Sequence, residues 1–190
     1  SYGGAQRAAF GMLQDLARRL IGLNPLEHEA VWQKLYRDCF WGRNGGPVVF
    51  GGISALDIAL WDIKGKAYGA PVHELLGGRQ RQSLRAYASQ LQNGWDGKPA
   101  RKPEDYAREA KAAVDKGFDA VKIDFFNFKE DAGRFNDAER TGLLAPRQMQ
   151  MLRARIAATR EAVGPGADII LENHCYTDAQ SAVQMGNMAK

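Results

Sequence analysis

A glutamate and a histidine separated by one residue, Glu172 and His174, are the most informative pair of side chains in this chain. They end an apolar stretch, residues 167–171, that is typical of a buried β-strand. Because side chains alternate between the two faces of a strand, we expect both to point the same way from its end. A carboxylate beside an imidazole can hold a hard cation next to a proton donor. The alternative is that Glu172 is a surface acid and His174 a turn residue.

A second pair, Lys122 and Asp124, follows the same alternation at the end of the strand predicted at residues 118–124. If the two strands are parallel neighbours, their carboxyl ends meet at one edge of the sheet and four ionisable side chains converge there. An internal ion pair that fills a layer of a barrel would explain Lys122 and Asp124 equally well. Two such pairs at equivalent places on consecutive strands nevertheless favour a functional site.

These strands belong to a second half of the chain in which strands and helices alternate. The alternation predicts parallel strands joined by crossover helices, in a barrel or in an open doubly wound sheet. No glycine-rich phosphate motif follows a strand, which argues against a dinucleotide-binding sheet. A polar insertion, residues 125–144, is predicted to be a lid or a surface excursion. The predicted strands are residues 83–89, 118–124 and 167–173, and the predicted helices are residues 103–116, about 146–163, and a last one capped by Thr177-Asp178.

The first half of the chain is predicted to be helical. Apolar residues recur at helical spacing across residues 4–20 and 53–68, and Asn24-Pro25 predicts the start of a helix between them. A glycine-rich break is predicted at residues 42–52, before the third helix. The pattern changes after residue 82, and we therefore place a domain boundary there.

The composition argues against several classes of protein. The 190 residues are 45% hydrophobic and 25% charged, as in ordinary globular proteins, and no apolar run reaches the roughly 20 residues that span a bilayer. The net charge of +4 comes from basic residues interspersed with acids, which argues against a nucleic-acid-binding track. Cys39 and Cys175 lie far apart without metal-ligand spacing, which favours reduced thiols and a cytoplasmic location.

The stretch ISALDIALWDIKGKAYGAPVHELLGG, residues 53–78, resembles the mandelate racemase/muconate lactonizing branch of the enolase superfamily. The preceding LIGLNPLEHEAVWQKLYRDCFW and the following LRAYAS fit the same pattern, so the resemblance covers nearly the whole chain. It implies an α+β capping domain followed by a modified (β/α) TIM-type barrel. Residues 1–82 would be the helical part of the N-terminal capping domain. Residues 83–190 would be the first three βα units of an enolase-type α/β barrel, in a chain that is a fragment of a longer enzyme.

The resemblance also implies a metal site. In such enzymes carboxylates from barrel strands three, four and five hold a divalent metal, normally Mg²⁺, and Glu172 matches the first of these ligands, where Asp is commoner. Lys122 and Asp124 match the Lys-x-Lys position of strand two, whose second lysine is a base in racemases. Asp124 in that place argues against racemase chemistry. His174 matches the general acid of acid-sugar dehydratases similar to galactonate dehydratase.

The resemblance therefore implies a Mg²⁺-dependent hydro-lyase that removes water from a small-molecule sugar acid to give a 2-keto-3-deoxy acid. Mg²⁺ and Lys122 would stabilise the enediolate, and His174 would protonate the departing β-hydroxyl. The alternatives are a racemase or epimerase that uses the same enediolate, and a non-catalytic relative that binds a sugar acid. We expect these 190 residues alone to be inactive, the full-length protein to be a cytoplasmic homo-oligomer, and neither nucleic acid nor membrane to be a partner.

Overall fold

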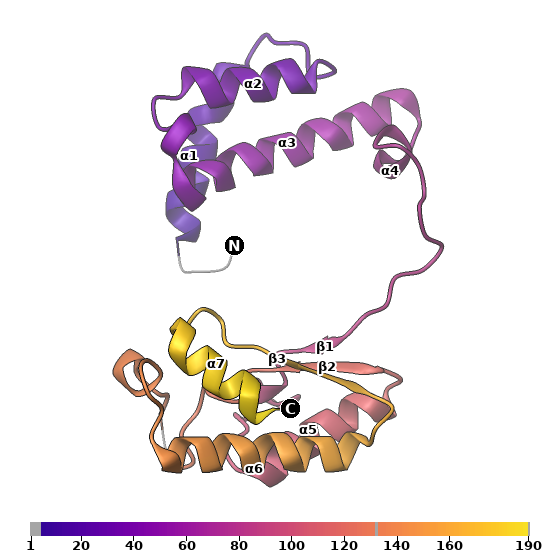
Figure 1. Ribbon diagram of the computed structural model, residues 1–190. Coiled ribbons are helices and arrows are strands. Elements are labelled where there is room, and N and C mark those ends of the chain that lie inside the picture. The colour runs from indigo at the N-terminus through magenta and orange to yellow at the C-terminus, as the bar shows by residue number, and fades with distance from the viewer. Residues whose placement is uncertain (1–4, 132, 190) are drawn as a thin grey trace. The chain divides into compact units, whose positions relative to one another are not determined.

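The computed structural model describes residues 5–131 and 133–189. The chain divides into two compact units, Ser1–Gln82 and Ser83–Lys190 (Figure 1). Each unit has a hydrophobic cluster of its own. The boundary between the units falls at the change of sequence pattern after residue 82.

The first unit consists of helices, drawn from indigo to magenta in Figure 1. Both α1 and α2 pack against α3, and Leu16, Leu35 and Ile53 are fully buried in the cluster that they form. Burial of one such side chain stabilises the fold by roughly 1.5–3 kcal/mol. The elements of this unit are α1 Gln6–Ala17, η1 Arg18–Leu20, α2 His28–Asp38, η2 Gly42–Asn44, α3 Gly46–Tyr68 and α4 Val72–Leu75.

The long helix α3 begins earlier than its sequence pattern indicates. The glycines of residues 42–52 predict a break, but Gly46 opens the helix and Pro47 occupies its first turn. A Cβ on Gly52 would lie 3.1 Å from the backbone nitrogen of Leu13 in α1. The glycine at position 52 therefore lets two helices approach closely, and the prediction of a break there is wrong.

By length and composition alone, α3 is also long and apolar enough to cross a membrane, within the part of the chain that the structure describes. Asp57 and Asp62 interrupt its apolar residues, so the helix contains no continuous apolar run of the roughly 20 residues that span a bilayer. Core helices of other proteins pass the same test. In this structure α3 packs against α1 and α2 through the buried Ile53 and Leu60.

The second unit contains a parallel sheet of three strands in the order β1–β2–β3, which confirms the predicted mixed α/β class. Ala88 pairs with Val121, and Val121 pairs with Ile169. The helices α5 and α6 lie side by side below the sheet in Figure 1. Closure into a barrel remains a prediction. The elements are β1 Ala88–Ser89, η3 Leu91–Asn93, α5 Pro103–Asp115, β2 Ala120–Ile123, η4 Asp137–Glu139, α6 Pro146–Val163, β3 Asp168–Leu171 and α7 Ala179–Met188.

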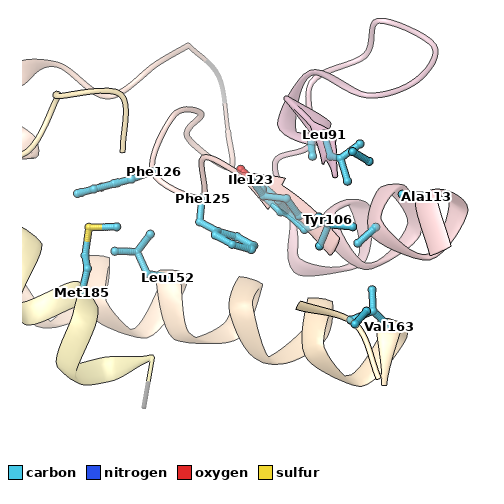
Figure 2. Packing of buried hydrophobic residues seen from close by; sticks show 14 of the residues in the cluster. Leu91, Tyr106, Ala113, Ile123, Phe125, Phe126, Leu152, Val163 and Met185 are labelled. Carbon is cyan, nitrogen blue, oxygen red and sulfur yellow. The ribbon is translucent and has the colours of Figure 1, made fainter. Parts of the chain in front are cut away.

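Aromatic side chains lie among the aliphatic residues in the core of the second unit (Figure 2). Phe125, which follows β2, lies between the sheet and the helices, with its ring 5.3 Å from that of Tyr106 in α5. Phe126 packs against Phe135 with ring centroids 4.7 Å apart. Residues 125–144 were expected to be polar, but aromatic side chains fix both the start and the middle of this excursion in the core. We call residues 125–144 the β2–α6 excursion.

The strands are shorter than the sequence pattern predicts. β1 has two residues, and β3 ends at Leu171 rather than at residue 173. His174 and Cys175, which follow β3, have positive φ angles of 51° and 61°. Residues other than glycine rarely adopt this left-handed conformation. A turn therefore directs His174, and the prediction that strand alternation directs it is wrong.

Candidate functional site

An ion pair joins the carboxyl ends of β2 and β3. Glu172 Oε2 lies 3.0 Å from Lys122 Nζ, and each side chain is 21% exposed. Lys122 pairs in register with Ile170, and alternation along β3 continues to Glu172, whose backbone nitrogen donates to Ile123 O at 3.0 Å. The hydrogen bond between the two side chains lowers the pKa of Glu172 and raises the pKa of Lys122. Both groups are therefore charged at neutral pH.

Tyr87 also contacts the lysine of this pair. Its hydroxyl lies 3.5 Å from Lys122 Nζ, and the centroid of its ring lies 5.1 Å from the same nitrogen. Sequence reasoning missed Tyr87, although the register contains the signal for it. Ser89 pairs with Lys122, and Tyr87 stands two residues before Ser89, so alternation places Tyr87 on the face that carries Lys122.

His174 lies beside the carboxylate of Glu172. Glu172 Oε1 accepts a hydrogen bond from the backbone nitrogen of His174 at 2.9 Å and lies 3.6 Å from His174 Nδ1. The imidazole is 38% exposed and stacks on the ring of Tyr176, with centroids 5.8 Å apart and planes 22° apart. The structure therefore brings Glu172, Lys122 and His174 together. The turn between Glu172 and His174 accounts for this, since one carboxylate binds both the backbone and the ring of the histidine.

Asp124 occupies a different environment from the other three predicted residues. It is 2% exposed, and its Oδ1 accepts a hydrogen bond from the backbone nitrogen of Phe126 at 3.0 Å. Its Oδ2 is buried and has no hydrogen-bond partner among the described residues. Burial raises the pKa of Asp124 to about 6, although the Phe126 bond and the nearby charges of Arg140 and His174 oppose the shift.

This environment corrects the expectation that Asp124 shares the mouth of the site with Lys122. Within residues 5–131 and 133–189, Lys122 pairs with Glu172, and no ion pair involves Asp124. The backbone of Asp124 instead donates to the side chain of the buried Gln92 at 3.3 Å. The carboxyl group is buried, but its charge still interacts with the charges of Arg140, His174 and Glu172.

The site also includes one residue that no sequence pattern indicates. Arg140 of the β2–α6 excursion is 6% exposed, and its guanidinium carbon lies 4.1 Å from the ring centroid of Tyr176. Nothing in the spacing of the excursion distinguishes Arg140 from the other basic residues around it. The contact depends on how the excursion folds back, which periodicity along the chain does not predict.

Of the two predicted carboxylates, Glu172 is the partly exposed one that could bind a hard cation, whereas Asp124 is buried. The carboxylate oxygens of Glu172 are of the type that Mg²⁺ prefers, and they lie at the exposed ends of the strands. The part of the chain that the structure describes holds no group of three His, Cys, Asp or Glu residues that could hold a metal ion. The donor chemistry therefore fits Mg²⁺, while the described residues supply one ligand of what would be a larger set.

Comparisons with known proteins find matches along both units. Residues 1–77 match the family model described as "Mandelate racemase / muconate lactonizing enzyme, N-terminal domain", and residues 105–190 match the one described as "Enolase C-terminal domain-like". The D-gluconate dehydratase of Thermoproteus tenax is 35% identical over 174 residues, which are 91% of this chain and 31% of that protein. The D-galactonate dehydratase of Pectobacterium atrosepticum is 33% identical over 180 residues, 94% of this chain and 41% of that protein.

Solved structures match as well. A proposed dehydratase from Zymomonas mobilis ZM4 is 48% identical in sequence and superposes with a TM-score of 0.94. The match covers 98% of this chain and 48% of the Zymomonas chain. This chain therefore spans less than half of the length of each of these three proteins.

Proposed function

Because this chain belongs to the mandelate racemase/muconate lactonizing enzyme family of the enolase superfamily, we propose that the intact protein is a Mg²⁺-dependent dehydratase of a sugar acid. Relatives named as D-gluconate and D-galactonate dehydratases, at 35% and 33% identity, support the reaction class. The single observation that carries the proposal is the cluster of Glu172, Lys122 and His174. It holds a carboxylate, a cation and an imidazole in contact at the ends of two parallel strands.

The first half of such a reaction needs positive charge at the carboxylate of the substrate. A proton α to a carboxylate is weakly acidic, so the enediolate that forms on its removal must be stabilised. Lys122 is protonated at neutral pH, and its hydrogen bond to Glu172 raises its pKa further. Its Nζ would lie beside the developing charge. A Mg²⁺ ion held by Glu172 and further ligands would supply additional positive charge there.

The second half needs a proton donor at the β-hydroxyl. Hydroxide is a poor leaving group, so the carbon–oxygen bond breaks readily only if the oxygen receives a proton as it leaves. His174 is partly exposed, and the carboxylate of Glu172 orients both its backbone and its ring. We assign it the transfer of that proton, which releases water. The enol that remains tautomerises to a 2-keto-3-deoxy acid.

Asp124 bears on the choice between dehydration and racemisation. It stands where the family resemblance implies the second lysine of racemases, and it is 2% exposed. A buried carboxyl group at this position lacks the amine that a second lysine would present as a base. The local structure therefore favours elimination over a two-base racemisation.

The test uses the full-length protein and a panel of aldonic and aldaric acids that includes D-gluconate and D-galactonate. We expect at least one acid to yield a 2-keto-3-deoxy product, detected as its semicarbazone, with added Mg²⁺ but not with excess EDTA. Exchange of the α-proton with deuterium from the solvent without loss of water would instead indicate an epimerase. Binding of an acid without either reaction would indicate a non-catalytic relative.

A further inference from the structure

The β2–α6 excursion is attached to the segment that carries His174. The backbone nitrogen of Gly142 donates to Asp178 Oδ2 at 2.7 Å, and that of Leu144 donates to Gln184 Oε1 at 2.9 Å. These two bonds fix the end of the excursion to the N-cap and the body of α7. A third contact, the guanidinium of Arg140 on the ring of Tyr176, reaches the turn itself.

Arg140 is held rigidly by its own loop. Its Nη2 donates to Phe135 O, and its Nε donates to Asn136 O at 3.4 Å. Its Nη1 is buried and has no hydrogen-bond partner among the described residues. Burying a cation with an unmatched donor is costly, so hydrogen bonding within the excursion does not by itself explain why Arg140 is buried. Arg140 Nη2 also lies 3.9 Å from Oδ1 of the exposed Asp137, and the contact with Tyr176 is the interaction that reaches beyond the excursion.

Tyr176 carries this contact on to the histidine. Its ring also stacks on that of His174, so Tyr176 contacts both Arg140 and His174, and we call these three residues the column. His174 and Cys175 have left-handed backbone conformations, which residues other than glycine keep only where surrounding contacts enforce them. The column is one such contact, and the Glu172 carboxylate that binds His174 N is another.

We propose that Arg140 is a positioning residue for His174 and that it acts through the ring of Tyr176. The inference rests on the proposed function where it takes His174 as the proton donor, while the column itself rests on geometry alone. Loss of the column would let the turn relax, and the imidazole would move away from Glu172. The β2–α6 excursion, which begins at the end of β2, thereby contacts the turn that follows β3 through the guanidinium of Arg140.

The experiment compares four variants of the full-length protein. Arg140→Met removes the cation, and Tyr176→Leu removes the ring while leaving the two carbonyl partners of Arg140 in place. Tyr176→Phe keeps the ring, and Arg134→Met removes a guanidinium that lies in the same excursion over Phe128, at 5.1 Å. The readouts are kcat, KM and the rate at which diethyl pyrocarbonate modifies His174, followed by peptide mass spectrometry.

We expect kcat to fall about 10- to 100-fold in Arg140→Met and Tyr176→Leu, because a displacement of about 1 Å at a reacting group has effects of this size. KM should stay within about twofold, and His174 should be modified several-fold faster. Tyr176→Phe and Arg134→Met should behave as wild type. If Arg140→Met does not fold, Tyr176→Leu decides, because it leaves the excursion's own hydrogen bonds intact.

Two results would overturn the proposal. One is an unchanged rate of His174 modification in Tyr176→Leu, and the other is a rise in KM with unchanged kcat, which would place Arg140 in substrate binding. If the wild-type protein dehydrates no acid, the proposed function fails. The modification rates then still decide whether the column positions His174.

Discussion

Three interactions of the site meet at the carboxylate of Glu172. One oxygen faces Lys122 Nζ, and the other accepts from the backbone of His174 and lies near its ring. Both contacts lower the pKa of Glu172, and its negative charge therefore persists in mildly acidic solution. A carboxylate in this state suits a divalent cation, since the ligand must be deprotonated to bind.

We predict that Glu172→Gln weakens Mg²⁺ binding by the intact protein about 10- to 100-fold, because the amide keeps an acceptor for His174 N but loses the charge. Isothermal titration calorimetry with Mg²⁺ measures the change. Glu161→Gln, on the exposed surface of α6, is the matched control and should leave the affinity unchanged. Equal Mg²⁺ affinities for the two variants would show that Glu172 is not a metal ligand.

Asp124 gives a prediction on pH. Its pKa is about 6 in the folded protein against 3.8 as the ordinary value, so the folded state binds the proton more tightly than the unfolded state. Stability from this group is fully present below pH 3.8 and is lost as the pH rises through about 6. The loss amounts to about 3 kcal/mol, taking 1.36 kcal/mol for each pKa unit.

Asp124→Asn should abolish this loss, since the amide does not ionise. We expect the free energy of unfolding of the variant, relative to wild type, to rise by up to about 3 kcal/mol between pH 4 and 7 in metal-free protein. Urea unfolding at a series of pH values measures it. Asp137→Asn, at a side chain that is 90% exposed in the same excursion, should show no such trend. If the difference in the free energy of unfolding between Asp124→Asn and wild type stays constant with pH, the pKa of Asp124 is not raised.

At the scale of residues, alternation along the strands predicts the Glu172–Lys122 contact and, once the register is known, the place of Tyr87 beside it. The contact follows because β2 and β3 are parallel neighbours in register. His174 reaches the same place through a left-handed turn, which no periodicity indicates. The place of Arg140 is harder still to predict from the sequence, because its contact with Tyr176 joins two segments that have no regular structure.

At the scale of elements, the helix α6 depends on one buried arginine. Arg155 is fully buried, and its Nη1 donates to Phe125 O at 2.7 Å while its Nη2 donates to Arg101 O. Its guanidinium also lies 5.0 Å from the ring centroid of Tyr106. The side chain thereby ties α6 to the start of the β2–α6 excursion and to the residues just before α5.

We predict that Arg155→Leu lowers the free energy of unfolding by roughly 2–4 kcal/mol, because two buried carbonyl oxygens lose their donors. Chemical denaturation of the intact protein gives this value. Arg153→Leu, at an exposed position on the same helix, should change it by no more than about 0.5 kcal/mol. Similar effects of the two substitutions would show that the carbonyl contacts do not matter for stability.

The helices of the second unit could be predicted more closely than its strands. Pro103 and Pro146 stand in the first turns of α5 and α6, and Gly117 and Gly164 follow their ends with positive φ, so local chemistry marks both boundaries. A strand has no comparable signal. Its end is set by hydrogen bonds to its neighbour, and β1 therefore keeps two residues of the seven in the predicted range 83–89.

At the scale of the whole molecule, each unit has a core of its own, and the site described above lies within the second unit. This chain spans less than half of the length of its dehydratase relatives. The described residues supply one carboxylate at the strand ends for a cation that takes several oxygen ligands.

We therefore predict that a polypeptide of these 190 residues alone forms no keto acid from any sugar acid, with or without Mg²⁺. The semicarbazone assay on the purified polypeptide, run beside the full-length protein, measures this. Mg²⁺-dependent product from the 190 residues would show that they carry a complete site.

The most direct test of the account is the division between proton exchange and elimination in a His174→Asn variant of the full-length protein. In D₂O with Mg²⁺ and the substrate acid, NMR follows the loss of the α-proton signal and the appearance of the 2-keto-3-deoxy product. If His174 protonates the leaving hydroxyl, the variant should still exchange the α-proton, while its product formation falls at least about 100-fold. Dehydration by His174→Asn at the wild-type rate would contradict the role given to this histidine.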